Sequence, residues 1–380
     1  MEKDKSLRQA VQALIFWFRK HKRDLPWRKN ADPYKILVSE FLLQQTTVPV
    51  AVRYYESFLT AFPTLESLAQ ASLEEVLRVW SGAGYYARAR NLRETAIRLV
   101  ATHGGVIPQE VSELKKLPGI GDYTARAIAS FAFGADAIAL DTNGIRVLAR
   151  LLGKKGSPRR PSFRRELYQV AEILCPKGKA SDFNQALMDL GSLICTASEP
   201  KCHQCCCSRG CFAFRSGRPQ DFPSVPEKPT RQPLFEVACL IVKDGQFLVA
   251  QRAPGRWWGH LWEFPRQEIN PNESSLAAVR RIAKEKLGLE VHPRAIVTTV
   301  RHSVTRYRIY LTGVLAEYQS GEPRGEGYVA FQWVSLADLN QLPSSSPQRR
   351  LVQTLLDMAR EGSQFALIAE VLNEPRGQVA

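Results

Sequence analysis

The sequence predicts a multidomain protein in which an all-α domain precedes an α+β domain. Its 380 residues exceed the length at which a single hydrophobic core usually stops growing. Apolar residues recur every three or four positions in the first part of the chain, which is typical of amphipathic helices. They recur every second position in the last part, which is typical of strands. Because five prolines separate these regions, we expect a helical domain at 1–215, an extended linker at 216–233, a mixed domain at 234–365 and a tail at 366–380.

In the first domain, the helical spacing begins with Leu7, Val11 and Leu14. Asp32-Pro33 is a typical helix start, because Asp accepts hydrogen bonds from free backbone amides and Pro fits the first helical position. Gly and Pro residues separate the periodic segments. The pattern predicts further helices over residues 50–60, 73–80, 85–101, 122–133, 144–152, 162–174 and 183–195.

In the second domain, strand-type alternation occurs twice. Residues 236–252 form a predicted hairpin whose turn is Asp244-Gly245, a pair that favours the positive φ angles of tight hairpins. Residues 298–318 are a second strand-rich stretch, and residues 277–288 between them have a helical period. This order predicts an α+β domain.

The chain is strongly basic. It carries 52 Lys and Arg against 37 Asp and Glu, a net charge of +15, and residues 1–231 hold +13 of this excess. Such a charge indicates a polyanionic partner, either nucleic acid or an anionic membrane surface. A hydrophobic content of 44% excludes wholesale disorder, and no apolar run approaches the roughly 20 residues of a membrane span. The N-terminal residues contain no secretory apolar core, so we expect an intracellular protein.

Five of the eight cysteines lie within residues 202–211, and clustered cysteines in an intracellular protein indicate a metal site rather than disulfides. The spacing C-x6-C-x2-C-x5-C joins four cysteines: Cys195, Cys202, Cys205 and Cys211. Four thiolates on a short loop suit a 4Fe-4S cluster or a tetrahedral zinc ion, and the single close pair favours the cluster. Cys206 and Cys207 leave the ligand choice open on chemistry alone, and an unliganded reactive tract is the alternative.

Two carboxylates lie in settings that suit acid and base chemistry. Glu40 lies among apolar residues in ILVSEFLLQQT, where desolvation raises a carboxyl pKa and keeps the proton near neutral pH, as a general acid requires. Asp141 precedes a predicted helix as its N-cap, and helix amides favour the ionised form. A solvent-facing Glu40 and a purely structural Asp141 are the alternatives. A protonated carboxyl held near an ionised one is what cleavage of a glycosidic bond needs.

Two further segments suit contact with a nucleic-acid backbone. In LPGIGDYTARA, Gly119 and Gly121 allow a ligand to approach closely, and the following helix offers free N–H groups to an anion. An ordinary helix–helix turn has the same composition. Tyr85-Tyr86 could stack on bases while nearby guanidinium groups meet phosphates, although core tyrosines beside a solvated basic face are the alternative. The arginines concerned are Arg88, Arg90 and Arg93.

The sequence resembles the MutY-type adenine DNA glycosylases in the order of its segments SEFLLQQT, GAGYYARARNL, LPGIGDYTARA, ALDTNGIRV and FNQALMDLGSLIC, followed by the cysteine loop. The resemblance covers essentially the whole chain. It implies an all-α helix-hairpin-helix glycosylase domain, with a 4Fe-4S cluster held by the four named cysteines in the loop 195–211, and a C-terminal α+β Nudix-like domain. It also implies a monofunctional enzyme of base excision repair, which flips and hydrolytically removes adenine mispaired with 8-oxoguanine or guanine in double-stranded DNA.

The resemblance further implies roles for individual residues. Glu40 would protonate adenine at N7 and later act on the attacking water, Asp141 would stabilise or add to the sugar cation, and Asn143 would assist. Tyr123 stands where strand-cleaving relatives carry a Lys, so no Schiff-base lyase route is expected, and its hydroxyl would hydrogen-bond within the base pocket. The resemblance also implies contacts with DNA. Gln45 and Tyr85 would wedge into the base stack, and Arg28 would contact the flipped adenine. Gly119 and Gly121 would bind phosphate.

The second domain resembles a Nudix domain that has lost its chemistry. A working Nudix box needs several glutamates on one helix to hold Mg²⁺, and this helix keeps only Glu285 among basic residues. We therefore expect no metal-dependent nucleotide hydrolysis. In the family, this domain recognises 8-oxoguanine through the segment that matches residues 301–307. Val304, Thr305 and Arg306 stand there in place of the usual Phe-Ser-His, which leaves the degree of 8-oxoguanine discrimination open.

Two other functions stay open from the sequence. One is an endonuclease III-like pyrimidine glycosylase with AP lyase activity, against which Tyr123 and the Nudix-like domain argue. The other is a non-catalytic iron–sulfur protein that binds DNA. For the leading prediction we expect a monomer that binds DNA and no membrane, and no protein partner is indicated. Its expected location is cytoplasmic and nucleoid-associated in a bacterium, or nuclear or mitochondrial in a eukaryote.

Overall fold

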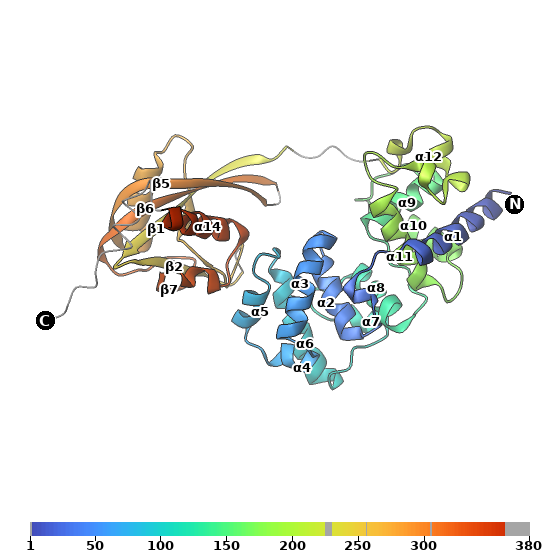
Figure 1. Cartoon of the computed structure of the whole chain (residues 1–380), viewed down its shortest axis with the longest axis horizontal. Helices are drawn as coiled ribbons and strands as arrows, with labels where there is room; N and C mark the ends of the chain where they lie inside the picture. Colours follow the sequence, from blue (N-terminus) through green and yellow to red (C-terminus); the bar gives the residue numbers. More distant parts are fainter. Residues whose placement is uncertain (1, 225–229, 256, 305, 362–380) are drawn as a thin grey trace. The chain divides into compact units, whose positions relative to one another are not determined.

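The computed structural model describes residues 2–224, 230–255, 257–304 and 306–361, and these residues form two compact units. The first unit contains the described residues up to Gln70 and from Arg90 to Ser224, and the second contains Ala71–Ala89 and those from Thr230 onward. The predicted fold class, an all-α domain followed by an α+β domain, is confirmed (Figure 1). The predicted tail at 366–380 lies outside the described residues.

The first unit is built from helices and short loops. Each helix predicted from periodicity is present within a few residues of its predicted ends. The six-residue α4 and the four-residue α7 were not predicted, because one or two turns carry too little periodicity. The elements are α1 (Glu2–His21), η1 (Pro26–Arg28), α2 (Pro33–Leu43), α3 (Val48–Ala61), α4 (Leu65–Gln70), α6 (Ala87–His103, which begins in the second unit), α7 (Val111–Leu114), α8 (Asp122–Phe133), α9 (Thr142–Leu152), α10 (Pro161–Leu174), α11 (Ala180–Leu193), η2 (Cys202–Gln204), η3 (Ser208–Gly210), α12 (Phe212–Arg215) and η4 (Pro219–Asp221).

Helix ends follow the capping chemistry of the sequence. Asp32 accepts hydrogen bonds from the amides of Tyr34 (2.9 Å) and Lys35 (3.2 Å), and so begins α2 as predicted. Gly134 and Gly153 end α8 and α9 in the left-handed conformation, each with a φ of 70°. These caps define the three helices that carry Glu40, Tyr123 and Asp141.

A hydrophobic core of the first unit joins α1, α9, α10 and α11 to the cysteine loop. Leu7, Val11 and Leu14 of α1 are buried in it, which is the helix face that their spacing predicted. Cys207 is also buried in this core, and the neighbouring cysteines pack against it. The cysteine loop is therefore part of the packing of the first unit.

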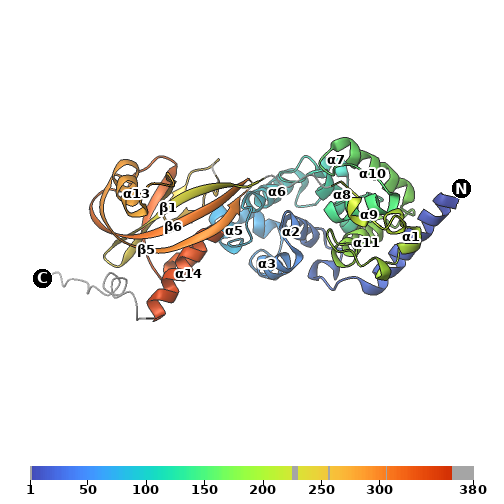
Figure 2. The same ribbon diagram turned by 90° about the horizontal axis from the view of Figure 1, so that it is seen from above.

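The second unit is a seven-stranded mixed sheet between two helices, α13 on one face and α14 on the other (Figures 1 and 2). The strand order is β3-β2-β1-β6-β5, with β4 paired to β1 and β7 paired to β2. The β1–β6 pair is parallel. The elements are α5 (Leu73–Val79), β1 (Gln232–Lys243), β2 (Gln246–Arg252), β3 (Trp262–Glu263), β4 (Arg266–Glu268), α13 (Ser275–Ile282), η5 (Ala283–Leu287), β5 (Leu289–Val304), β6 (Tyr307–Gly321), β7 (Tyr328–Ser335), η6 (Asp338–Gln341) and α14 (Ser346–Glu361).

The predicted strand and helix segments of this unit are confirmed. Asp244 and Gly245 form the turn between β1 and β2, with φ angles of 49° and 71°, as the hairpin prediction required. The second strand-rich stretch contains the end of β5 and most of β6, which pair up to Val304 and Tyr307 beside their turn. The helical segment predicted between them is α13 with η5.

Two segments pack differently from the predicted domain boundaries. Ala71–Ala89 falls inside the predicted helical domain but packs in the second unit. Residues 219–224 fall inside the predicted linker, yet Arg150 donates hydrogen bonds to the carbonyls of Pro219 (2.9 Å) and Phe222 (3.0 Å) and holds them on the first unit. Both differences arise from contacts between segments that are distant in the chain. Local composition does not predict such contacts.

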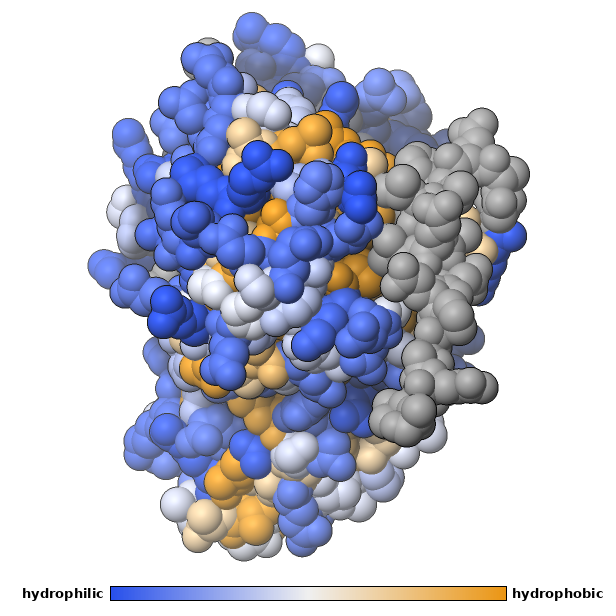
Figure 3. Space-filling model, turned by 90° about the vertical axis from the view of Figure 1, so that its left-hand side faces the viewer, coloured by the Kyte–Doolittle hydropathy of each residue, from blue (hydrophilic) through white to orange (hydrophobic). Residues whose placement is uncertain are grey.

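Hydrophilic side chains cover most of the face shown in Figure 3, and apolar side chains show between them. The buried apolar residues of the second unit form two cores, one on each face of its sheet. Among the helices that the structure describes, none combines the length and apolarity needed to cross a lipid bilayer.

Candidate active site

A cavity of about 670 Å³ in the first unit brings together the predicted catalytic residues. Its wall is formed by the segment before α2 and by residues of α2, α8, α9 and α11. The predicted site residues on this wall are Arg28, Glu40, Gln45, Tyr123, Asp141 and Asn143. The fold therefore collects at one place side chains that the sequence spreads from residue 28 to residue 143.

Glu40 is a buried carboxyl in the middle of α2, with an exposed fraction of 4%. Burial raises the pKa of Glu40 to about 8; the charge of Asp141 adds to this rise, and a hydrogen bond with Tyr123 opposes it. Its Oε2 has no hydrogen-bond partner among the described residues. At pH 7 this carboxyl is mostly protonated, and it can donate its proton to a molecule in the cavity.

Tyr123 lies in the first turn of α8 and hydrogen-bonds the Glu40 carboxyl. Burial, together with the charges of Glu40 and Asp141, raises the pKa of Tyr123 well above its ordinary value. The phenol therefore stays neutral at physiological pH. It orients the Glu40 carboxyl without supplying the amine that a Schiff base would need.

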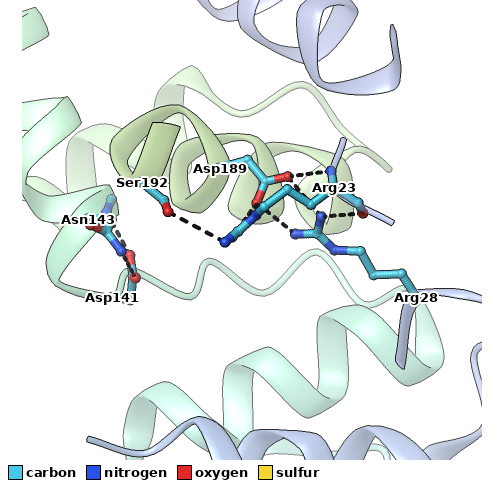
Figure 4. Close-up of polar contacts among 7 residues, drawn as sticks. Arg23, Arg28, Asp141, Asn143, Asp189 and Ser192 are labelled. Carbon is cyan, nitrogen blue, oxygen red and sulfur yellow. Dashed lines mark hydrogen bonds and ion pairs between the residues drawn. The ribbon is translucent and has the colours of Figure 1, made fainter. Parts of the chain in front are cut away.

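Asp141 is the N-cap of α9, as predicted. Its Oδ1 accepts a hydrogen bond from the amide of Gly144 (2.7 Å), and its Oδ2 accepts one from the side chain of Asn143 (2.9 Å; Figure 4). Burial raises the pKa of Asp141 and outweighs these two donors and the charge of Arg146, which lower it. The helix cap was visible in the sequence, whereas the desolvation that drives the pKa upward comes from the fold.

Two arginines of the same cavity wall, Arg23 and Arg28, form ion pairs with one carboxylate behind them (Figure 4). The fully buried Asp189 of α11 accepts hydrogen bonds from Arg23 (2.6 Å) and Arg28 (2.8 Å). Burial alone would raise the pKa of Asp189, but the hydrogen bonds and charges of these two arginines lower it below its ordinary value. Asp189 and Arg23 were not predicted as site residues; an acidic residue inside the apolar run FNQALMDLGSL is the signal that could have found Asp189.

The two residues predicted to wedge into a base stack share an unusual backbone conformation. Gln45 and Tyr85 have φ angles of 55° and 47°, in the left-handed region that residues other than Gly rarely adopt. Both side chains are exposed, that of Tyr85 to 59%. Gln45 belongs to the first unit and Tyr85 to the second. Each is thus presented by a strained turn.

The turn before α8 contains the two predicted phosphate-binding glycines. Gly119 has a φ of 75°, and a Cβ there would lie 2.8 Å from Asn91 and 3.0 Å from the ring of Phe41. Gly121 is the N-cap of α8, and a Cβ there would meet nothing within 4 Å. No side chain caps this helix start among the described residues, so its first amides are open to an anion. The fold therefore requires a glycine at position 119, whereas it has room for a side chain at position 121.

The four predicted metal ligands line one small cavity, to which Cys206 and Cys207 do not contribute. The Sγ atoms of those two residues lie 3.7 Å apart, and Cys207 points to the carbonyl of Ala10. Nowhere in the described residues do three Cys, His, Asp or Glu side chains converge closely enough for one metal ion. Cys195, Cys202, Cys205 and Cys211 thus share one cavity, as the thiolate ligands of one metal group would.

Two arginines of α9, neither of them predicted, connect this loop to the site. Arg146 donates to the side-chain oxygen of Asn143 (2.8 Å) and to the carbonyl of Cys195 (2.9 Å). The buried Arg150 donates to the Sγ of Cys195 (3.3 Å). Their i, i+4 spacing, which places both on one helix face, is the signal that could have paired them. One helix therefore carries Asp141 at its start and holds the cysteine loop along its side.

The predicted lesion-reading segment is the turn between β5 and β6. Val304 ends β5, and Thr305 lies outside the described residues. Arg306 is exposed; it donates to the hydroxyl of Tyr307 (2.7 Å), and its guanidinium lies 5.0 Å from that ring. The ring of Trp257, 46% exposed, lies 5.9 Å from the same ring. A guanidinium and two aromatic rings therefore lie close together at the start of β6.

The helix of the degenerate Nudix box holds its acidic residue in an ion pair. Glu285 is 4.0 Å from Arg281, which also pairs with Glu273 at 2.7 Å. Elsewhere in this unit Arg266 pairs with the buried Glu263 (3.1 Å). Guanidinium groups thus pair with both carboxylates, and the expected lack of metal-dependent hydrolysis stays a prediction.

Known families match both parts of the chain. Residues 38–172 match the HhH-GPD superfamily base excision DNA repair protein, and residues 237–354 match the NUDIX domain. An adenine DNA glycosylase of Arabidopsis thaliana is 36% identical over 310 residues, which are 71% of this chain and 49% of the relative. An adenine DNA glycosylase of Buchnera aphidicola subsp. Baizongia pistaciae is 38% identical over 264 residues, 69% of this chain and 74% of the relative. The match thus spans about half the length of the plant relative.

Two solved structures resemble somewhat more than half of the chain. A thermostable thymine-DNA glycosylase is 31% identical, with a TM-score of 0.52, over 57% of this chain and 100% of the other. Endonuclease III in a trapped covalent intermediate with DNA is 25% identical, with a TM-score of 0.50, over 56% of this chain and 98% of the other.

Proposed function

The chain belongs to the adenine DNA glycosylase family, and from this premise we propose that it removes adenine mispaired with 8-oxoguanine or guanine from double-stranded DNA. The reaction is hydrolysis of the N-glycosidic bond, without strand cleavage. One observation carries the proposal: Glu40 faces the cavity with a pKa of about 8 and an oxygen that has no partner among the described residues, on the same wall as Asp141. This pair matches the demands of glycosidic-bond cleavage.

In the proposed reaction, Glu40 gives its proton to N7 of the flipped adenine. The bond between C1′ and N9 then breaks, and its electron pair leaves with the base, which departs neutral. Asp141 stabilises the positive charge on the sugar or bonds to C1′. A water molecule adds to C1′ and gives a proton to the Glu40 carboxylate, which restores the acid. Tyr123 orients Glu40, and Asn143 holds Asp141 through its 2.9 Å hydrogen bond.

The cavity is the proposed site of the extruded adenine. Extrusion costs a few kcal/mol of lost stacking, which contacts inside the cavity must offset. Arg28 supplies one such contact, and Asp189 keeps its guanidinium in place. On the DNA side, the proposal assigns phosphate binding to the amides near Gly121, stacking to Gln45 and Tyr85, and recognition of 8-oxoguanine to the turn at residues 304–306.

We propose that Cys195, Cys202, Cys205 and Cys211 hold a 4Fe-4S cluster. When bound, the cluster supplies a cross-link that closes the loop at residues 195–211. Arg150 donates to the sulfur of Cys195, and Arg146 links the carbonyl of the same residue to Asn143. The chain's own contribution is thus a path of hydrogen bonds from the loop to the side chain that holds Asp141.

The test is single-turnover release of adenine from a duplex that carries A opposite 8-oxoguanine. Because Glu40→Gln keeps the shape but cannot give up a proton, we expect its rate constant to fall by about 10²–10⁴-fold. Glu94→Gln on the exposed face of α6 is the matched control and should retain the wild-type rate. Release that persists in Glu40→Gln would refute the assignment, and a wild-type protein that binds DNA without releasing base would favour the non-catalytic alternative.

The lyase alternative has a specific candidate amine. Lys22 is the one lysine among the described residues that line the cavity. If the protein nicks the strand without added alkali, and Lys22→Gln abolishes the nick, the monofunctional assignment is wrong. We expect strand cleavage only after alkali treatment.

A further inference from the structure

We infer that the second unit positions Tyr85 for insertion into the DNA stack, because residues 343–349 clamp the turn that presents this side chain. Ser81, Tyr86 and Arg349 are on this inference positioning residues, which act through Tyr85 and not on the substrate. The inference rests on the proposed function, in which Tyr85 wedges into the stack near the mispair.

The turn at residues 82–85 is strained. Gly82, Gly84 and Tyr85 have φ angles of 96°, 73° and 47°. A tyrosine rarely adopts the left-handed region, and such a conformation persists only where its surroundings determine it. The strained backbone presents a side chain that is 59% exposed. The surroundings of the turn should therefore contain the groups that maintain it.

One set of such groups lies within the segment itself. The guanidinium of Arg88 donates to the carbonyls of Ala83 (3.0 Å) and Gly84 (2.9 Å), and the indole of Trp80 donates to the same Gly84 carbonyl (3.1 Å). The same guanidinium lies 5.1 Å from the ring of Trp80 and 5.7 Å from that of Tyr85. Arg88 and Trp80 are both buried. These contacts fix the shape of the turn.

A second set fixes its position on the C-terminal part of the chain. The hydroxyl of Tyr86 donates to the carbonyl of Ser344 (2.6 Å) and accepts from the amide of Gly82 (3.0 Å). The hydroxyl of Ser81 donates to the same carbonyl (3.2 Å) and accepts from the amide of Ser344 (3.3 Å). Arg349 donates to the carbonyl of Ser81. Because Tyr86 and Ser344 are 5% and 4% exposed, losing one partner would leave a buried polar group unsatisfied.

The acceptor segment is itself held by the sheet. The amide of Trp262 in β3 donates to the carbonyl of Pro343 (2.9 Å), and Trp262 and Ser344 form an isolated parallel bridge. The amide of Phe264 donates to the side chain of Gln348 (3.0 Å). The Tyr85 turn is therefore attached to the same sheet that ends in the lesion-reading turn. One compact unit carries both the wedge and the 8-oxoguanine reader.

The functional arm of the test uses the full chain and a duplex with A opposite 8-oxoguanine. Tyr86→Phe removes the buried donor, and we expect the single-turnover release rate to fall about five- to tenfold while the DNA dissociation constant changes less than the rate. A 2-aminopurine beside the mispair should report correspondingly less unstacking. Tyr34→Phe is the matched control, since that buried hydroxyl donates to the carbonyl of Phe62 (2.7 Å) in the first unit. Its release rate should match the wild type.

The structural arm does not depend on activity. Hydrogen exchange of the peptide at residues 80–88 should accelerate about tenfold in Tyr86→Phe and in Ser81→Ala, but not in Tyr34→Phe.

Unchanged exchange in both clamp variants would overturn the clamp. Faster exchange with an unchanged release rate would overturn the positioning role. A wild-type protein without adenine release would overturn the proposed function and so the role of Tyr85, while the exchange data would still decide whether the clamp exists. If Tyr86→Phe does not fold, Ser81→Ala is used in both arms.

Discussion

Glu40 is the residue at which burial has the clearest chemical consequence. The carboxyl loses its hydration on α2, so that its protonated form is favoured up to a pKa of about 8. Asp141 shares the cavity but has two hydrogen-bond donors, Gly144 and Asn143. Burial raises the pKa of both carboxyls, but only Asp141 has the amide of Gly144 and the side chain of Asn143 to oppose the rise, which favours Glu40 as the proposed acid and Asp141 as the proposed stabilising anion.

The pH dependence of base release follows from Glu40. Above pH 8 the single-turnover rate constant should fall about tenfold per pH unit, because the fraction of protonated Glu40 falls by that factor. On the acid side the rate should fall as Asp141 takes up a proton, at a pH above the ordinary aspartate pKa because burial raises it. A rate that rises between pH 8 and pH 9.5 would contradict the role of Glu40 as acid.

Burial of Glu40 should also make the free energy of unfolding depend on pH. The folded state binds more protons than the unfolded state between the ordinary pKa of 4.5 and the raised pKa of about 8, so unfolding free energy falls as pH rises through this window. Glu40→Gln removes the titrating group. Relative to the wild type, we expect it to be stabilised by up to about 5 kcal/mol above pH 8 and by little below pH 4.5. Thermal unfolding at both pH values checks this; equal midpoints at pH 8.5 would exclude a strongly desolvated Glu40.

At the scale of elements, α9 combines two tasks. Its N-terminus carries Asp141, and its buried face carries Arg146 and Arg150, which hold the cysteine loop. A shift of the loop would therefore reach Asn143 through Arg146 without any contact with the substrate. The loop and the catalytic pair are thus coupled by one rigid helix and one guanidinium.

The α7–α8 turn offers a matched pair of glycine variants. Gly119→Ala places a Cβ within 2.8 Å of Asn91 in a left-handed conformation, and we expect a loss of about 1–3 kcal/mol of stability. Gly121→Ala has an ordinary φ of −84° and no neighbour within 4 Å, so its stability should be nearly unchanged. If the amides near Gly121 bind phosphate, Gly121→Ala should nevertheless weaken DNA binding. Denaturant unfolding and DNA titration separate the two effects; equal destabilisation by both variants would contradict the steric argument.

At the scale of the whole chain, periodic and local features could be predicted from the sequence. The helices, the Asp244-Gly245 hairpin and the cap at Asp141 depend on neighbours within a few residues. Ala71–Ala89 is attached to the second unit by contacts such as the hydrogen bond from Tyr86 to a backbone carbonyl more than 250 residues away. Because every residue has a backbone carbonyl, the sequence does not indicate which one will accept such a bond. Asp189 and Arg146 were missed for the same reason: each has partners on other helices or loops.

Removal of the proposed cluster should affect the two units differently. The cysteine loop packs against the core of the first unit, and Cys207 meets the carbonyl of Ala10 in α1. Loss of the cluster opens a loop that this core needs, so hydrogen exchange in α1 and in residues 195–215 should accelerate at least about tenfold, because metal binding and folding are coupled at such sites. The strands β1 and β6, with their own cores, should keep their protection. The measurement compares hydrogen exchange before and after oxidative loss of the visible iron–sulfur absorbance. Equal acceleration in both units would show that the cysteine loop does not stabilise the first unit alone.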